Sequence, residues 1–167
     1  MRNAECGMRS EVRSLAVRPC LAIAICTAGL TTIADDKSDD FTTQTLRGKV
    51  VFLAEAMEKE TGVRSVPEAK DRILALQTES GELVPLLEDS RGRAFRRDER
   101  LRQMKVELLV RRYRHSPLAQ IIRVYEVAPD GRYEIDYWCD ICAIAMVEKK
   151  DCECCQGPVQ LRRQKVD

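Results

Sequence analysis

Five cysteines lie close together near the C-terminal end of this 167-residue chain, and their spacing constrains the fold more than any other feature. Cys139 and Cys142 form one CxxC pair, and Cys152 and Cys155 form a second pair after nine intervening residues. Two CxxC turns that face each other supply four thiolates in a tetrahedron, the ligand arrangement of a closed structural zinc site. We therefore predict a Zn²⁺ site formed by these four cysteines, with Cys154 as the alternative ligand.

Two other chemistries stay open for the same cysteines. In an oxidising compartment paired cysteines form disulfides, and five cysteines would give two bridges and one free thiol. Each CxxC pair could also exchange disulfides, although no thioredoxin-like βαβ pattern surrounds either pair. Gly157 favours zinc, because it stands where a zinc knuckle needs a residue without a Cβ so that backbone N–H groups can point at sulfur.

The first 34 residues have the pattern of a secretory signal peptide. Four arginines precede an apolar run over residues 21–34, and Thr32-Ile33-Ala34 offers small side chains at a cleavage site. The run has about 14 residues, which is shorter than the roughly 20 that cross a bilayer. We expect residues 1–34 to be removed and the mature chain to be periplasmic or extracellular, without a transmembrane span. A membrane anchor that is never cleaved is the alternative.

The charge of the mature chain argues against nucleic acid as a partner. Removal of residues 1–34 takes away four basic and two acidic residues, which leaves 24 basic against 25 acidic side chains. A nearly neutral protein has no global field that would attract a polyanion or an anionic membrane. Aromatic residues make up 5% of the chain, so a platform for base stacking is also poorly supplied.

The rest of the chain predicts a mainly β (α+β) fold. Residues 35–44 are acidic and polar and predict a disordered linker. Short β-rich segments separated by Gly and Pro turns follow, at residues 46–51, 73–78, 83–87, 106–113 and 118–127. We predict a small OB-like antiparallel barrel over residues 45–132, with an SH3-like barrel as the alternative, and a zinc-ribbon-like cysteine module over residues 133–167.

Two short helical segments are expected between the first two strands. Residues 52–59 carry strong helix formers and are followed by Gly62, a residue suited to end a helix. Ser65 and Glu68 have the spacing of a capping box, with Pro67 in the first turn, so a helical turn is predicted to begin there.

The chain resembles an uncharacterised family of exported bacterial proteins that have a small OB-like domain and a cysteine tail. The resemblance rests on the tail, Tyr137-Trp138-Cys139-Asp140-Ile141-Cys142 and Cys152-Glu153-Cys154-Cys155. It extends to Leu46-Arg47-Gly48, Asp98-Glu99-Arg100-Leu101 and Ile122-Arg123-Val124-Tyr125, and so spans nearly all of the mature chain. The family implies one shared architecture and brings no established activity.

The sequence favours a non-enzymatic binding or scaffold protein that acts on an unknown protein or cell-envelope partner. No catalytic residues are identified, because His115 is the only histidine and no hydrolase motif or phosphate loop is present. A thiol-redox or metal-handling protein that uses the same cysteines is the first alternative. The second is a protein that binds nucleic acid or an acidic glycan through the arginine-rich segment at residues 91–102.

Overall fold

The structure is a computed structural model, and it describes residues 40–166. The predicted signal peptide and residues 35–39 of the predicted linker lie outside the described residues. The elements, in chain order, are β1 (Phe41–Phe52), α1 (Leu53–Thr61), the 3-10 helix η2 (Pro67–Ala69), β2 (Leu74–Thr78), β3 (Leu83–Pro85), α2 (Ser90–Arg97), α3 (Glu99–Gln103), β4 (Val106–Tyr113), β5 (Ala119–Ala128), β6 (Gly131–Cys139), β7 (Ile144–Met146) and β8 (Gln160–Val166).

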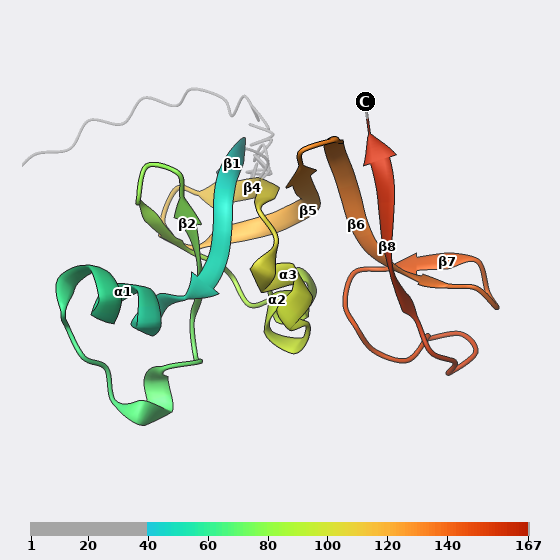
Figure 1. Cartoon of the computed structure of the whole chain (residues 1–167), viewed down its shortest axis with the longest axis horizontal. Coiled ribbons are helices and arrows are strands. Elements are labelled where there is room, and N and C mark those ends of the chain that lie inside the picture. Colours follow the sequence, from blue (N-terminus) through green and yellow to red (C-terminus); the bar gives the residue numbers. More distant parts are fainter. Residues whose placement is uncertain (1–39, 167) are drawn as a thin grey trace, which may run out of the picture. The chain divides into compact units, whose positions relative to one another are not determined.

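The strands form one antiparallel sheet in the order β3-β2-β1-β4-β5-β6-β7, and β8 pairs with β6 (Figure 1). β6 is the branch point of this sheet. The first part of β6 pairs with β5, and its last three residues pair with β7. β8 runs along the other edge of β6 over Arg132–Trp138. The boundary that we predict between residues 132 and 133 therefore falls inside a strand.

The prediction of an OB-like barrel is wrong, because the sheet does not close on itself. β3, at one end of the strand order, has three residues and ends at Pro85, which cannot donate a hydrogen bond to a further strand. Helices take the place of the missing closure: Phe95 of α2 and Leu101 of α3 are buried in the same core cluster as Leu108 and Ile121 of the sheet. The mainly β antiparallel character of the prediction is confirmed.

Gly48 marks the position where β1 changes partner. Residues 41–48 of β1 pair with β4, and residues 48–52 pair with β2 on the other edge. A Cβ on Gly48 would stand 2.1 Å from the carbonyl oxygen of Gln77, so only glycine allows β2 to approach β1 this closely.

The first strand and the two short helical segments test the predictions made for residues 35–72. β1 begins at Phe41, so residues 41–44 of the predicted disordered linker are part of a strand. α1 ends at Gly62, which has the left-handed conformation (φ 73°) expected there. The capping box is wrong: η2 begins at Pro67 after Val66, and no side chain caps it. None of the helices in residues 40–166 is long and apolar enough to cross a membrane.

A buried carboxylate on β4 is paired with one arginine from β1 and one from β6. Glu107 is 3% exposed, and its two oxygens accept from Arg47 Nε and Arg132 Nη1 at 2.6 Å each. Burial raises the pKa of Glu107, but the two guanidinium groups outweigh it and the net pKa is lowered. The side chain is therefore ionised at neutral pH and joins β1, β4 and β6.

A second buried carboxylate joins α3 to the strand that leads into the cysteines. Asp98, which is 3% exposed, caps α3 and accepts from Arg100 Nη2 at 2.6 Å and from Tyr137 Oη at 2.9 Å. The hydrogen bonds from Arg100 outweigh burial, and with the bond from Tyr137 they lower the pKa of Asp98 to about 2. Tyr137 is buried in the core cluster, and its hydroxyl group links β6 to the N-terminus of α3.

Candidate metal centre

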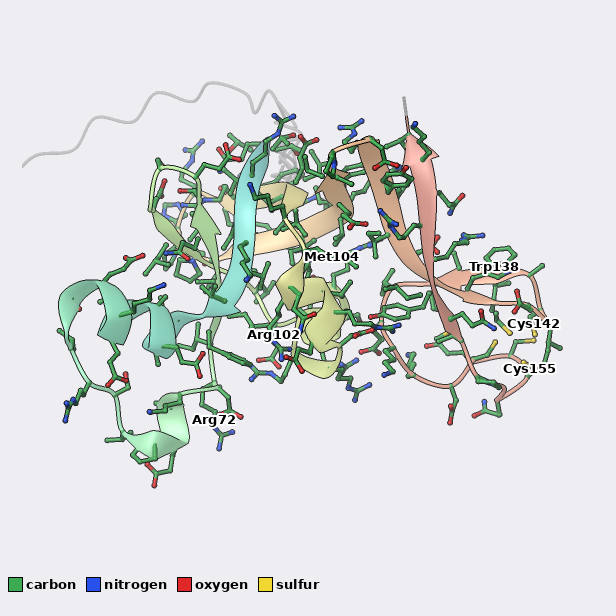
Figure 2. All side chains as sticks on the ribbon, in the orientation of Figure 1. Arg72, Arg102, Met104, Trp138, Cys142 and Cys155 are labelled. Atoms are coloured by element: carbon green, nitrogen blue, oxygen red, sulfur yellow. The ribbon has the colours of Figure 1, made fainter. Side chains whose placement is uncertain are left out.

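Four of the five predicted cysteines come together at the end of β6. Cys139 is the last residue of β6, Cys142 lies in the turn before β7, and Cys152 and Cys155 lie in the loop before β8. Their four Sγ atoms all lie within 4.8 Å of one another, and those of Cys139 and Cys155 are 3.5 Å apart. Figure 2 shows sulfur atoms gathered beside Cys142 and Cys155. A tetrahedral Zn²⁺ with Zn–S bonds of about 2.3 Å separates its sulfurs by roughly 3.8 Å, so this group could hold a metal ion.

The two CxxC turns have the same backbone design. Ala143 N–H donates to the carbonyl of Cys139 at 2.8 Å, and Gln156 N–H donates to the carbonyl of Cys152 at 2.9 Å. Ala143 and Gln156 are also the two non-glycine residues with positive φ in residues 40–166, at 53° and 59°. Each turn therefore ends in a left-handed residue directly after its second cysteine, a conformation that costs a non-glycine residue about 1 kcal/mol.

Backbone N–H groups in both turns point at the sulfur of the first cysteine. Those of Cys155 and Cys154 lower the pKa of the Cys152 thiol to about 7. The N–H of Cys142 acts in the same direction on the pKa of Cys139, but burial and the thiols of Cys152 and Cys155 reverse it, and the net shift is upward. Thiols crowded in this way resist simultaneous ionisation, and a cation among them would relieve the repulsion between four thiolates.

Gly157, which we predict as a residue without a Cβ beside the sulfurs, lies next to Cys155. Its φ is not positive, and the left-handed residue of the second turn is Gln156. A Cβ on Gly157 would stand 3.2 Å from Cys155 Sγ and 3.1 Å from Cδ1 of Ile141. Its carbonyl accepts from Cys152 N–H at 2.8 Å. Glycine therefore leaves room beside the Cys155 sulfur, and the backbone conformation does not require it.

Burial separates the fifth cysteine from the other four. Cys139 and Cys152 are fully buried and belong to the hydrophobic core, while Cys142 and Cys155 are half-buried and pack against it. Cys154 is exposed and is not part of the group whose sulfurs meet. The structure thus brings together Cys139, Cys142, Cys152 and Cys155 and leaves Cys154, the predicted alternative ligand, at the surface.

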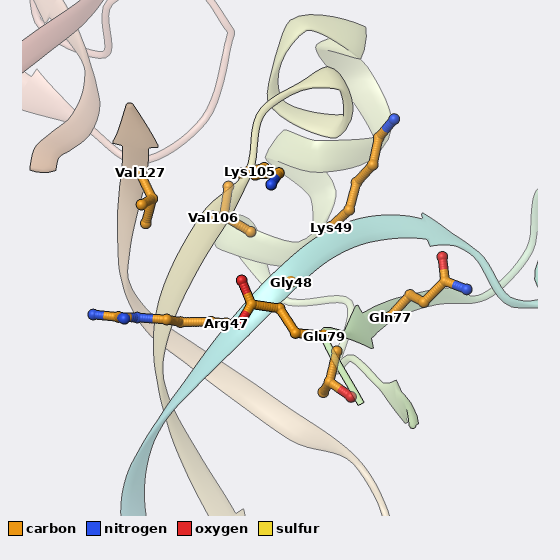
Figure 3. A pocket seen from close by; sticks show the side chains of 9 residues that line it. Arg47, Gly48, Lys49, Gln77, Glu79, Lys105, Val106 and Val127 are labelled. Carbon is orange, nitrogen blue, oxygen red and sulfur yellow. The ribbon is translucent and has the colours of Figure 1, made fainter. Parts of the chain in front are cut away.

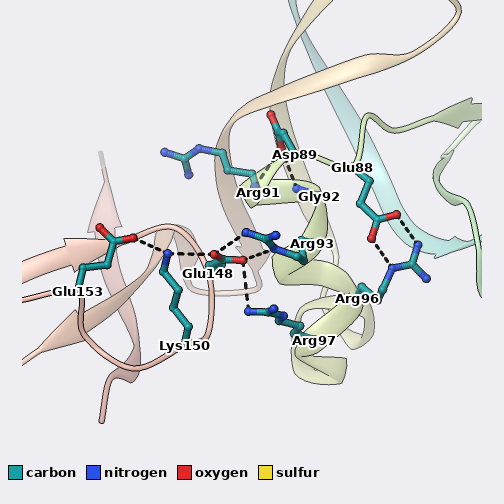
Figure 4. Close-up of polar contacts among 10 residues, drawn as sticks. All are labelled: Glu88, Asp89, Arg91, Gly92, Arg93, Arg96, Arg97, Glu148, Lys150 and Glu153. Carbon is teal, nitrogen blue, oxygen red and sulfur yellow. Dashed lines mark hydrogen bonds and ion pairs between the residues drawn. The ribbon is translucent and has the colours of Figure 1, made fainter. Parts of the chain in front are cut away.

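A buried glutamate in the cysteine region was not identified from the sequence. Glu148, which is 1% exposed, lies in the loop between the two CxxC turns (Figure 4). Its oxygens accept from Arg93 Nε at 2.6 Å and from Arg93 Nη2 at 2.8 Å. The hydrogen bonds from Arg93 outweigh burial and lower the pKa of Glu148. In the sequence Glu148 precedes two lysines, and nothing in that pattern distinguishes it from a solvated charge.

The arginine-rich segment is largely occupied by contacts within the protein. Arg96 donates to Glu88 Oε1 at 2.5 Å and Oε2 at 2.7 Å, and Arg100 holds Asp98. Arg102 donates to the carbonyls of Phe95 and Arg96. These guanidinium groups stabilise α2 and α3 and do not form a row of free positive charges.

A separate pocket lies where β1 passes from β4 to β2 (Figure 3). It has a volume of about 280 Å³, and Gly48, Val106 and Val127 contribute to its walls, with Lys49 and Lys105 among its basic residues. No cysteine lines this pocket, so the cysteine group and the pocket are distinct features of the protein.

Comparisons of the chain with protein-family models, with curated proteins and with solved structures found no match. The class of site therefore rests on geometry: a mainly β protein with a C-terminal group of four cysteines that could hold a metal ion.

Proposed function

We propose that this chain is an exported, non-enzymatic binding or scaffold protein whose C-terminal region is held together by a structural Zn²⁺ ion. The observation that carries the proposal is the meeting of four Sγ atoms within 4.8 Å, supplied by two turns of the same backbone design. Four thiolates in a tetrahedron favour Zn²⁺ or iron among the common metals, and Zn²⁺ brings no redox chemistry.

A structural role fits this site better than a catalytic one. Catalytic zinc sites keep one coordination position for water or substrate, whereas four protein ligands complete the tetrahedron. Cys139 and Cys152 are also part of the hydrophobic core, so their sulfurs are shielded from a substrate. The metal would then link the end of β6 to the loop before β8, next to the point where β8 itself pairs with β6.

Native mass spectrometry of the mature protein, with and without a chelator, tests the proposal. We expect one Zn²⁺ per chain, lost on chelation, with all five thiols reduced. Cys139→Ser and Cys154→Ser form a matched pair, because Cys139 is a buried member of the group and Cys154 is exposed outside it. Cys139→Ser should lose the metal and Cys154→Ser should keep it. Loss of about four hydrogens without any metal, the mass of two disulfides, would contradict the zinc proposal.

A thiol-redox or metal-handling function is the second candidate, and the exposure of Cys154 favours it. Cys154 stands between Glu153 and the metal-group residue Cys155, so an exchanging thiol would be available at the surface. This candidate predicts fast alkylation of Cys154 in the folded protein and a measurable disulfide potential. A wild-type protein that reduces a disulfide substrate, with this activity abolished by Cys154→Ser, would favour it over the structural role.

Export is the remaining part of the proposal, and the N-terminal sequence supports it. Arginines followed by an apolar run and a small-residue cleavage site predict a mature N-terminus at Asp35. N-terminal sequencing of the protein recovered from a cell fraction outside the cytoplasm should begin at this residue. A partner from the cell envelope would then be sought by cross-linking in that fraction. A protein that still carries the arginine-rich segment and the apolar run of residues 1–34 would contradict cleavage.

A further inference from the structure

A chain of ionic contacts runs from the second CxxC turn to α2 (Figure 4). Glu153, between Cys152 and Cys154, pairs with Lys150 Nζ. Lys150 Nζ lies 3.2 Å from Glu148 Oε1, and Glu148 accepts two hydrogen bonds from Arg93 on α2. The contacts thus begin inside the candidate metal centre and end on a helix that contributes no cysteine.

Glu148 is the central member of this chain because it is both buried and fully paired. Arg97 adds a third cation, with Nη1 at 3.6 Å from Oε2. A carboxylate that is 1% exposed needs these partners, because leaving a buried charge unpaired is strongly destabilising. The loop that carries Glu148 and the helix that carries Arg93 therefore stabilise each other through this contact.

The position of Glu148 in the chain ties this contact to the cysteines. Nine residues, 143–151, separate Cys142 from Cys152, and Glu148 lies among them. A metal bound by both turns fixes the two ends of this loop, and so limits where Glu148 can lie. Without a metal, the loop is held at its ends by the three-residue pairing of β7 and the backbone bonds of the two turns.

α2 has few other contacts of this strength with the cysteine region. Phe95 and Ala94 pack it into the core, and Asp89 caps its first turn by accepting from Arg91 and Gly92 N–H groups. Arg96 faces Glu88, a partner outside the cysteine region. The Arg93–Glu148 contact is thus the main polar connection between α2 and the loop.

We infer that metal occupancy of the four cysteines controls how firmly α2 is docked, through the Glu148–Arg93 contact. This inference rests on the proposed metal site and adds to it a conformational effect on a helix outside the site. Loss of the metal releases the loop, Glu148 leaves its buried position, and α2 loses an anchor. The metal then stabilises the docking of α2 on the loop as well as the fold of the C-terminal region.

Peptide-resolved hydrogen exchange of the mature protein tests this inference, with Zn²⁺ bound and after chelation. In the wild type, exchange of residues 90–97 should accelerate about tenfold on chelation, within the range typical of coupling between sites. In Arg93→Gln, α2 should exchange fast even with metal bound, and chelation should add little. Arg96→Gln is the control, because it breaks an exposed pair on the same helix and should keep the full response. Glu148→Gln repeats the test from the loop side.

The outcomes separate this inference from the proposed function. If native mass spectrometry finds no metal on the folded protein, the proposed function fails and this inference fails with it. If metal binds and is removed but exchange of residues 90–97 does not change, only the coupling is wrong. If chelation accelerates exchange of residues 90–97 in Arg93→Gln as much as in the wild type, the inference is also wrong, because metal loss would then affect α2 without the Glu148–Arg93 contact. Equal acceleration in α1 would indicate global unfolding and would overturn it too.

Discussion

The hydrogen bond between Tyr137 and Asp98 gives the sharpest test of how the cysteine-bearing strand is anchored. Tyr137→Phe removes only the hydroxyl group, which donates to the buried carboxylate at 2.9 Å. A hydrogen bond to a charged group contributes roughly 1.5–3 kcal/mol, and Asp98 keeps its bonds from Arg100, so we expect a loss of about 2 kcal/mol in unfolding free energy at pH 7.

The pH dependence of this loss follows from the pKa of Asp98. Its folded pKa of about 2 lies below the ordinary value of 3.8, so ionised Asp98 stabilises the fold above pH 3.8, and this stability is lost as the pH falls through 2. The difference corresponds to about 2 kcal/mol, part of which comes from Tyr137. The effect of Tyr137→Phe should therefore shrink to about 1 kcal/mol near pH 2, where the acceptor becomes neutral.

Urea denaturation at pH 7 and near pH 2 measures both quantities. Tyr133→Phe is the matched control, because its hydroxyl donates to Asp130 at an exposed position, and we expect it to cost less than about 0.5 kcal/mol. The reasoning is refuted if the two variants are equally stable at pH 7, or if the loss in Tyr137→Phe is the same at both pH values.

Three further predictions follow from close contacts and backbone conformation. Gly48→Ala should destabilise the protein by about 3 kcal/mol in thermal or urea unfolding, because its Cβ would meet the Gln77 carbonyl at 2.1 Å; a stability within error of wild type would contradict this. Ala143→Gly should stabilise the metal-bound protein by about 0.5 kcal/mol, since relief of the left-handed conformation exceeds the added entropy of the unfolded chain, and a lower midpoint would count against the turn geometry. Glu107→Gln should cost about 2 kcal/mol at pH 7, because it replaces two charge-assisted hydrogen bonds, from Arg47 and Arg132, with weaker neutral ones. A milder effect than that of Glu134→Gln, at a carboxylate that pairs with Arg123 at the surface, would be inconsistent with this role.

Some parts of the structure that follow from local sequence were predicted correctly, although the capping box at Ser65 and the disordered residues 41–44 were not. Residues 106–113 were predicted as a strand and form β4 with the same bounds, because Val106, Val110 and Tyr113 favour strands and the turn residues Ser116 and Pro117 follow the segment. The four clustered cysteines were also predicted, because two CxxC pairs at this spacing leave few other ways to bring four sulfurs together.

The parts that depend on contacts distant in sequence were not predicted. Whether the sheet closes depends on which edges find partners, and no local pattern shows that Phe95 and Leu101 fill the core from one side. The burial of Glu148 depends on Arg93, which lies 55 residues earlier in the chain. The left-handed conformation of Ala143 and Gln156 was not predicted either, because neither residue type favours it and only the position directly after each second cysteine marks it.

The position of β6 limits where the chain can be cut into fragments that still fold. One edge of this strand pairs with β5 and then with β7, and the other edge pairs with β8. The same nine residues therefore belong to the sheet and to the cysteine region. A gene fragment that stops before β6 would leave the end of β5 without its neighbour, and one that starts after it would separate Cys139 from the other three cysteines. The cysteine region is therefore poorly suited to transfer between genes as a cassette, and shuffling experiments should keep residues 41–166 as one piece.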